Sequence, residues 1–255
     1  MLFRSYQTDF SMWRYGGFLS ATAKLFRDKV TLTAGLRTDG NSYLAAGNDL
    51  GKQLSPRLSA TVSITDRLNG NFSLARYYKI PPYTILGFQE NGVQVNKNVD
   101  YIRSDHYVAG LEWLPSSTLR FTVEGFYKSY SQYPVSRVKG ISMANFGGDF
   151  GVFGNESIVS SGKGRTYGME FLFQQRLTKN FYGILAYTYY FSEFSGFDPV
   201  TQQPTPFGAS AWDNRHLLSF TGGYRLGKQW EVGLRFRLQG GAPYTPYDIN
   251  RSLDY

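Results

Sequence analysis

Apolar and polar side chains alternate along most of the chain, and the alternation is clearest near its carboxyl end. In residues 230–238 every second side chain is apolar, and charged residues or glycine occupy the positions between them. The apolar row consists of Trp230, Val232, Leu234, Phe236 and Leu238. A period of two is typical of a β-strand, in which successive side chains point to opposite faces. A second alternating run, 216–226, precedes the short turn 227–229, so the two runs predict a β-hairpin.

The same pattern recurs along the chain and predicts about ten antiparallel strands in five hairpins. The hairpins are expected at residues 15–37, 55–78, 103–131, 164–191 and 216–238. Each strand has about ten residues, more than the usual five or six of globular proteins and enough to cross a bilayer at a tilt. Turns of three or four residues alternate with much longer loops. This asymmetry predicts an all-β, up-and-down transmembrane barrel with short periplasmic turns and long extracellular loops, built as one domain over residues 1–255.

Composition narrows the class of protein further. Aromatic residues make up 17% of the chain, and there is no cysteine, which excludes a disulfide framework and cysteine-bound zinc. The longest apolar runs are too short for a membrane-spanning helix, which needs about 20 residues. The net charge is +8, but lysine and arginine are scattered singly, so we expect no nucleic-acid partner.

A soluble β-sandwich binding module is the alternative that alternation alone leaves open. Three features favour the membrane barrel over it. The polar rows contain many small residues, the loop asymmetry extends over all five hairpins, and aromatic residues stand beside the short turns. These aromatic residues, which suit the interfacial girdle of a membrane barrel, are Phe26, Trp113, Phe181 and Trp230.

Three segments resemble the barrel of TonB-dependent outer-membrane receptors. They are SPRLSATVSITDRLNGNFSLARYYKIPP (55–82), GRTYGMEFLFQQRLTKNFYGILAYTYYFSEF (164–194) and WDNRHLLSFTGGYRLGKQWEVGLRFRLQGGAPYTP (212–246). The resemblance implies a 22-stranded barrel with a plugged lumen, located in the bacterial outer membrane and energised through a TonB box. Neither a plug nor a TonB box is recognisable in this sequence, and we expect the chain to be a fragment from the middle and later strands of such a barrel.

The sequence offers little that could support catalysis. His106 and His216 are the only histidines, and they are far apart, so a metal site is not expected. No serine can be paired with an oriented histidine as hydrolysis requires. We therefore expect neither an enzyme nor a cofactor.

Binding and transport remain as the predicted activity. The charged positions of the alternating strands are expected to face the barrel lumen, where water or a plug can meet them. We expect two lumen arginines and several aromatic residues near the outer loops to contact a ligand. These candidates are Tyr77, Tyr78, Tyr83, Phe88, Trp212, Arg235 and Arg237.

The resulting hypothesis is an outer-membrane receptor for TonB-energised uptake of a scarce ligand, such as a siderophore, cobalamin or an oligosaccharide. Its expected partners are outer-membrane lipid, the ligand and, by resemblance, an inner-membrane TonB-type energy-coupling protein. A passive porin-like or adhesive outer-membrane barrel is the second hypothesis.

Overall fold

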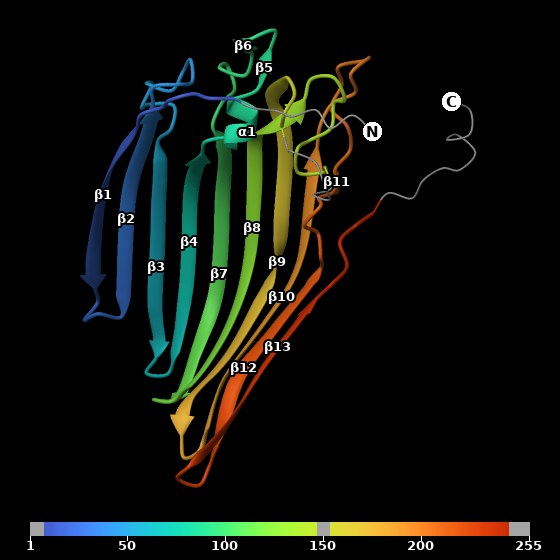
Figure 1. The fold of residues 1–255 in the computed structure, drawn as a ribbon. Coiled ribbons are helices and arrows are strands. Elements are labelled where there is room, and N and C mark those ends of the chain that lie inside the picture. Colours follow the sequence, from blue (N-terminus) through green and yellow to red (C-terminus); the bar gives the residue numbers. More distant parts are fainter. Residues whose placement is uncertain (1–7, 147–153, 245–255) are drawn as a thin grey trace.

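The computed structural model describes residues 8–146 and 154–244, and its main feature is one large antiparallel sheet. Ten long strands follow one another across it in chain order (Figure 1). They are β1 (Arg14–Leu25), β2 (Val30–Asn41), β3 (Ser55–Thr65), β4 (Leu68–Lys79), β7 (Ile102–Ser116), β8 (Leu119–Ser136), β9 (Ile158–Thr178), β10 (Phe181–Ser195), β12 (His216–Leu226) and β13 (Trp230–Gln239). This is the predicted up-and-down arrangement.

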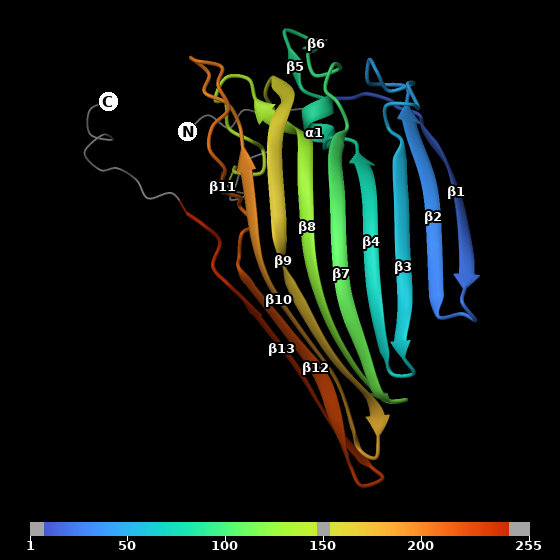
Figure 2. The same ribbon diagram turned by 180° about the vertical axis from the view of Figure 1, so that it is seen from behind.

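The sheet is curved and open, with β1 and β13 at its two edges, as the opposite views in Figures 1 and 2 show. Short turns lie at one end and long connections at the other. The long connections contain the smaller elements α1 (Tyr83–Leu86), β5 (Gln89–Glu90), β6 (Val93–Gln94) and β11 (Gly208–Ala209). Within the described residues, no helix is long and apolar enough to cross a membrane.

Strand register divides the side chains between an apolar and a polar face. Phe236 of β13 pairs with Phe220 of β12, and Arg235 pairs with Thr221. Directly paired residues share a face of the sheet, so Phe236 lies on the apolar face and Arg235 on the polar one. The same division continues across the sheet, where Leu58 and Leu74 pair on the apolar face and Thr61 and Asn71 pair on the polar face.

Two rows of aromatic side chains cross the apolar face. The row nearer the long loops contains Tyr107, Tyr127, Tyr167 and Phe191, whose successive ring centres are 6.3, 6.3 and 5.1 Å apart. The row nearer the short turns contains Trp113, Phe121 and Phe173, at 5.3 and 5.2 Å. On β7 the rows are separated by about 20 Å of strand. Paired aromatic girdles that flank an apolar band are typical of outer-membrane barrels.

Several strands extend further into the loops than the sequence pattern predicts. The expected loop 132–163 is shorter, because β8 continues to Ser136 and β9 starts at Ile158. Gln132 has a positive φ of 56°, and the register shifts between Tyr130 and Tyr133. Such a bulge inserts an extra residue and breaks the alternation, which hides the strand from a period-two analysis.

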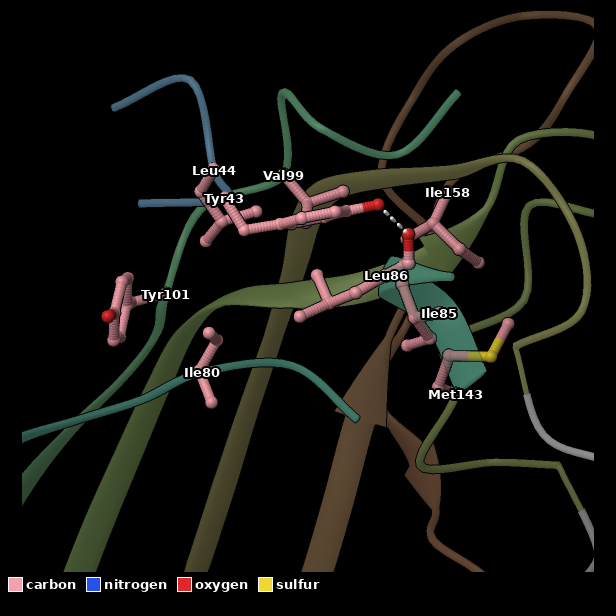
Figure 3. Packing of buried hydrophobic residues seen from close by; sticks show 9 residues of the cluster. All are labelled: Tyr43, Leu44, Ile80, Ile85, Leu86, Val99, Tyr101, Met143 and Ile158. Atoms are coloured by element: carbon pink, nitrogen blue, oxygen red, sulfur yellow. Dashed lines mark hydrogen bonds between the residues drawn. The ribbon is translucent and has the colours of Figure 1, made fainter. Parts of the chain in front are cut away.

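The buried core lies among the long loops rather than along the sheet. It contains Tyr43, Leu44, Ile80, Ile85, Leu86, Val99, Tyr101, Met143 and Ile158 (Figure 3). The Tyr43 hydroxyl donates a 2.5 Å hydrogen bond to the carbonyl of Leu86 in α1, drawn in Figure 3. Burial raises the pKa of the Tyr101 hydroxyl, which accepts a hydrogen bond from the Asn41 amide. These contacts hold the loop end together as a packed unit.

Candidate functional site

A cavity of ≈ 360 Å³ lies at the loop end of the sheet, beside the buried core. We call it the loop-end cavity. Its lining is mainly apolar and consists of Lys79, Pro82, Ile85, Ile102, Tyr133, Pro134, Met143 and Trp212. Ligand sites are typically concave, mostly apolar and provided with a few polar groups, so this cavity is the strongest candidate site in the described structure.

The ends of three adjacent strands form one wall of the loop-end cavity. Lys79 of β4 pairs with Ile102 of β7, and both lie on the polar face. Tyr133 of β8 reaches the same face because the bulge at Gln132 shifts the register, after which Tyr133 pairs with Gly162. The polar face of the sheet therefore leads directly into the cavity.

The long loops supply the rest of the wall. Ile85 belongs to the single helical turn α1, which follows Pro81 and Pro82. The buried Asn96 side chain donates to the Ile85 carbonyl at 2.8 Å and to the Glu156 carbonyl at 2.9 Å. Asn96 also accepts a hydrogen bond from the Ile158 amide at 2.9 Å, and so joins three segments behind the cavity.

Trp212 closes another side of the loop-end cavity. Its carbonyl accepts a hydrogen bond from the Tyr190 hydroxyl, and its amide donates to Ser210 Oγ at 3.4 Å. Because its backbone is held while 51% of the residue remains exposed, the indole surface is available to a ligand. Trp212 is the one predicted candidate that lines this cavity.

The other aromatic candidates lie near the cavity but in different environments. Tyr77 is on the polar face of β4, two residues before Lys79, with its ring centre 4.7 Å from that of His106. Tyr83 begins α1 and is 52% exposed, and Phe88 lies between α1 and β5. Tyr78 pairs with Arg103 on the opposite face from Tyr77 and packs against the buried core.

The two candidate arginines lie together on β13, away from the aromatic candidates and from the loop-end cavity. Arg235 and Arg237 lie on the polar face of β13, paired with Thr221 and Ser219. Tyr77 lies on β4, six strand positions away, which is roughly 29 Å across the sheet at about 4.8 Å per strand. The predicted set therefore divides between the loop end of β4 and the edge strand β13.

Several cavity residues were not among the predicted candidates. They are Lys79, Pro82, Ile85, Ile102, Tyr133, Pro134 and Met143. The double proline at 81–82 is the one local signal that marks this region, because it ends β4 and begins a non-strand segment. Met143 reaches the cavity only through the folding of the loops, and Tyr133 of β8 reaches it only because of the bulge at Gln132.

The part of the chain that the structure describes contains no group of three or more histidine, aspartate or glutamate residues placed to hold a metal ion. Some charged residues on the polar face form ion pairs with each other. Arg120 pairs with Glu112 at 2.6 Å, and Arg225 pairs with Glu231 at 3.0 Å.

The family model "TonB dependent receptor-like, beta-barrel" matches residues 3–254. The chain therefore belongs to this family, and its strands form part of a barrel in the bacterial outer membrane. No curated protein sequence matches the chain.

Solved structures of outer-membrane receptors share the fold at low identity. The ferripyoverdine receptor of Pseudomonas aeruginosa, bound to ferripyoverdine, is 14% identical with a TM-score of 0.63, and the match covers 94% of this chain and 30% of that one. The alcaligin receptor FauA of Bordetella pertussis is 16% identical with a TM-score of 0.56, covering 90% and 37%. The iron transporter FrpB of Neisseria meningitidis is 15% identical with a TM-score of 0.58, covering 89% and 32%. The chain thus spans about a third of the length of these proteins.

Proposed function

We propose that the protein is an outer-membrane receptor that captures a small molecule at the loop-end cavity and transports it inward through the barrel. The observation that carries this proposal is the position of the cavity. It opens where the polar face of β4, β7 and β8 meets the long loops, so a bound molecule lies at the entrance to the lumen. Binding function commonly resides on loops that a rigid scaffold positions.

The structural relatives support a small-molecule cargo. They include a receptor bound to ferripyoverdine and an iron transporter. For this protein we propose uptake of a scarce small molecule energised by a TonB-type inner-membrane protein, with outer-membrane lipid around the apolar face. In this proposal the chain contributes one barrel domain and performs binding and transport without catalysis.

A comparison of culture media tests the proposal and identifies the ligand in the same experiment. Isogenic strains with and without this protein are grown in the same medium, each with and without TonB, and small molecules are quantified by mass spectrometry. We expect at least one compound to be depleted only when both proteins are present. Depletion that needs this protein but not TonB would instead indicate a passive porin-like barrel, and no depletion would favour an adhesive barrel.

A matched pair of variants connects the transport to the cavity. Trp212→Ala removes the exposed indole from the cavity wall, whereas Val200→Ala shortens a side chain that is 90% exposed on a neighbouring loop. We expect Trp212→Ala to slow depletion and Val200→Ala to leave it unchanged. Equal rates for the two variants would place capture elsewhere on the barrel.

A further inference from the structure

A second cavity, of ≈ 280 Å³, lies among the loops on the outward side of the sheet. We call it the outer pocket, and its lining consists of Arg137, Val159, Ser161, Lys163, Ser195, Gly196, Phe197, Gln202 and Pro204. Lys163 of β9 pairs with Ser195 of β10, and further along β9 Tyr167 pairs with Phe191. Side chains an even number of positions apart on a strand share a face. Lys163 and Ser195 therefore lie on the same outward face as the aromatic row that contains Tyr167 and Phe191.

The outer pocket stands above the aromatic row, on its loop side. The four positions from Tyr167 to Lys163 correspond to about 13 Å of strand at about 3.3 Å per residue, or a height of about 10 Å at a strand tilt of about 40°. Girdle aromatics sit at the level of the headgroups, and the headgroup layer is only about 5–7 Å thick on each side of a bilayer. The outer pocket is therefore higher than a phosphate attached directly to glycerol, and it requires a headgroup that extends further from the hydrocarbon.

The charge of the outer pocket is positive. Arg137 and Lys163 are both exposed, and the remaining polar groups of its described lining are hydroxyls and an amide, from Ser161, Ser195 and Gln202. Neither cation forms an ion pair with a carboxylate within residues 8–146 and 154–244. A concave site lined by one sign of charge attracts ions of the opposite sign.

The nearby carboxylates have other partners. Glu193 accepts a 2.7 Å hydrogen bond from Nε of Arg165, and Asp198 accepts the backbone amides of Val200 and Thr201 at 2.8 and 3.0 Å. Neither carboxylate belongs to the lining of the outer pocket. The positive charge of Arg137 and Lys163 is therefore available to an external anion.

Arg165 connects the outer pocket with the aromatic row below it. It lies on β9 between Tyr167 and Lys163, on the same face. Its guanidinium is 5.8 Å from the centre of the Tyr167 ring and 4.6 Å from that of Phe207, and its side chain remains partly exposed. The outward face thus changes along β9 from apolar, through aromatic, to cationic. This order matches a lipid that has acyl chains, an interfacial region and an anionic headgroup.

We propose that the outer pocket binds a phosphate group on the sugar headgroup of a glycolipid in the outer leaflet, and that Arg137 and Lys163 hold this phosphate. The long loops of an outer-membrane barrel are extracellular, so the outer pocket faces the outer leaflet. Arginine and lysine are the usual partners of phosphate, and the hydroxyl and amide groups of the lining suit the hydroxyls of a sugar. The inference does not depend on the proposed capture function, because the outer pocket faces lipid rather than the lumen.

Two lipids of similar charge test this inference. Lipid A has several acyl chains and phosphate groups on a sugar headgroup, whereas cardiolipin has several acyl chains and phosphate groups on glycerol. The full-length protein in detergent is mixed with equal amounts of both, and the bound lipids are counted by native mass spectrometry. We expect lipid A to be retained about fivefold more than cardiolipin, the upper range for an exposed ion pair. Equal retention of the two lipids would overturn the inference, as would retention of neither.

Variants assign the binding to the outer pocket. Arg137→Gln and Lys163→Gln should each weaken the retention of lipid A by up to about fivefold, and the double substitution by about tenfold. Lys163→Arg should retain binding because it keeps the positive charge. Lys128→Gln is the matched control, because Lys128 of β8 pairs with Thr166 of β9 on the polar face and so removes the same charge at a similar height inside the barrel.

The control separates a specific site from a general attraction to positive charge. Unchanged retention of lipid A in the double variant would overturn the assignment to the outer pocket. A loss in Lys128→Gln as large as that in Lys163→Gln would also overturn it, because net charge alone would then explain the binding. None of these results bears on the capture function, which is decided by the depletion measured in Trp212→Ala cells.

Discussion

Phe236 of β13 lies directly opposite Phe220 of β12 on the apolar face of the sheet. This register fixes the face on which every other side chain of β13 lies. Because side chains alternate, Leu234 and Leu238 share the apolar face with Phe236, whereas Arg235 and Arg237 point the opposite way. A slip of one residue would move both guanidinium groups to the lipid side, so the register of this hairpin is strongly specified.

Adding a charge to the apolar face of β13 should therefore lower the folding free energy far more than removing a charge from its polar face. Leu234→Arg places a guanidinium on the lipid face, which destabilises a barrel by about 2–4 kcal/mol near the middle of the membrane. Arg235→Leu replaces a lumen-facing residue and should change the folding free energy by much less. Folding titrations of the full-length protein in lipid vesicles check this. A larger loss for Arg235→Leu would show that the two faces have been assigned the wrong way round.

The loops and turns should differ in accessibility on intact cells. Val200 is 90% exposed in the loop between β10 and β11, and Lys228 lies in the turn between β12 and β13. The chain has no native cysteine, so single substitutions can be labelled without background from it. We expect Val200→Cys to react with a membrane-impermeant maleimide on intact cells, and Lys228→Cys to react only after the outer membrane is opened. Equal labelling of both sites on intact cells would contradict the orientation.

Asn96→Ala should loosen the loop end without unfolding the sheet. The substitution leaves two carbonyls, of Ile85 and Glu156, and the amide of Ile158 without their hydrogen-bond partner. Each buried group left in this state costs about 1–3 kcal/mol. Hydrogen exchange should become faster at Ile158 and in α1 and remain unchanged in the middle of β12.

Gln203→Ala is the control for this variant, because Gln203 is an exposed loop residue. Unchanged exchange in Asn96→Ala would mean that packing of the buried core holds the loops without this side chain.

Gly140→Ala should disturb the contact between two long loops more than Gly92→Ala does. Both glycines have a positive φ, 67° at Gly140 and 77° at Gly92, a conformation that costs other residues about 1–2 kcal/mol. A Cβ at Gly140 would also meet the carbonyl oxygen of Phe197, whereas a Cβ at Gly92 meets open space. We expect limited proteolysis to cut residues 196–207 faster in Gly140→Ala than in Gly92→Ala. Similar cleavage rates would show that the two loops separate easily.

Alternation along the chain was sufficient to predict the transmembrane sheet, its turns and the direction of its side chains. A strand has a period of two, and lipid on one face with water or protein on the other turns that period into a visible sequence pattern. The opposite directions of Leu234 and Arg235 and the pairing of β12 with β13 follow from this pattern alone. The resemblance to receptor barrels then identified the family that the model match shows.

Only the tertiary structure decided which residues meet at the loop end. The bulge at Gln132 turns Tyr133 to the polar face, and the hydrogen bonds of Asn96 place α1 against β9. Such contacts join segments about 60 residues apart and leave no periodic trace in the sequence. The loop-end cavity could not be predicted for this reason. Trp212, which we expected to contact a ligand because it is a large aromatic residue in a long loop, is the one candidate that lines this cavity.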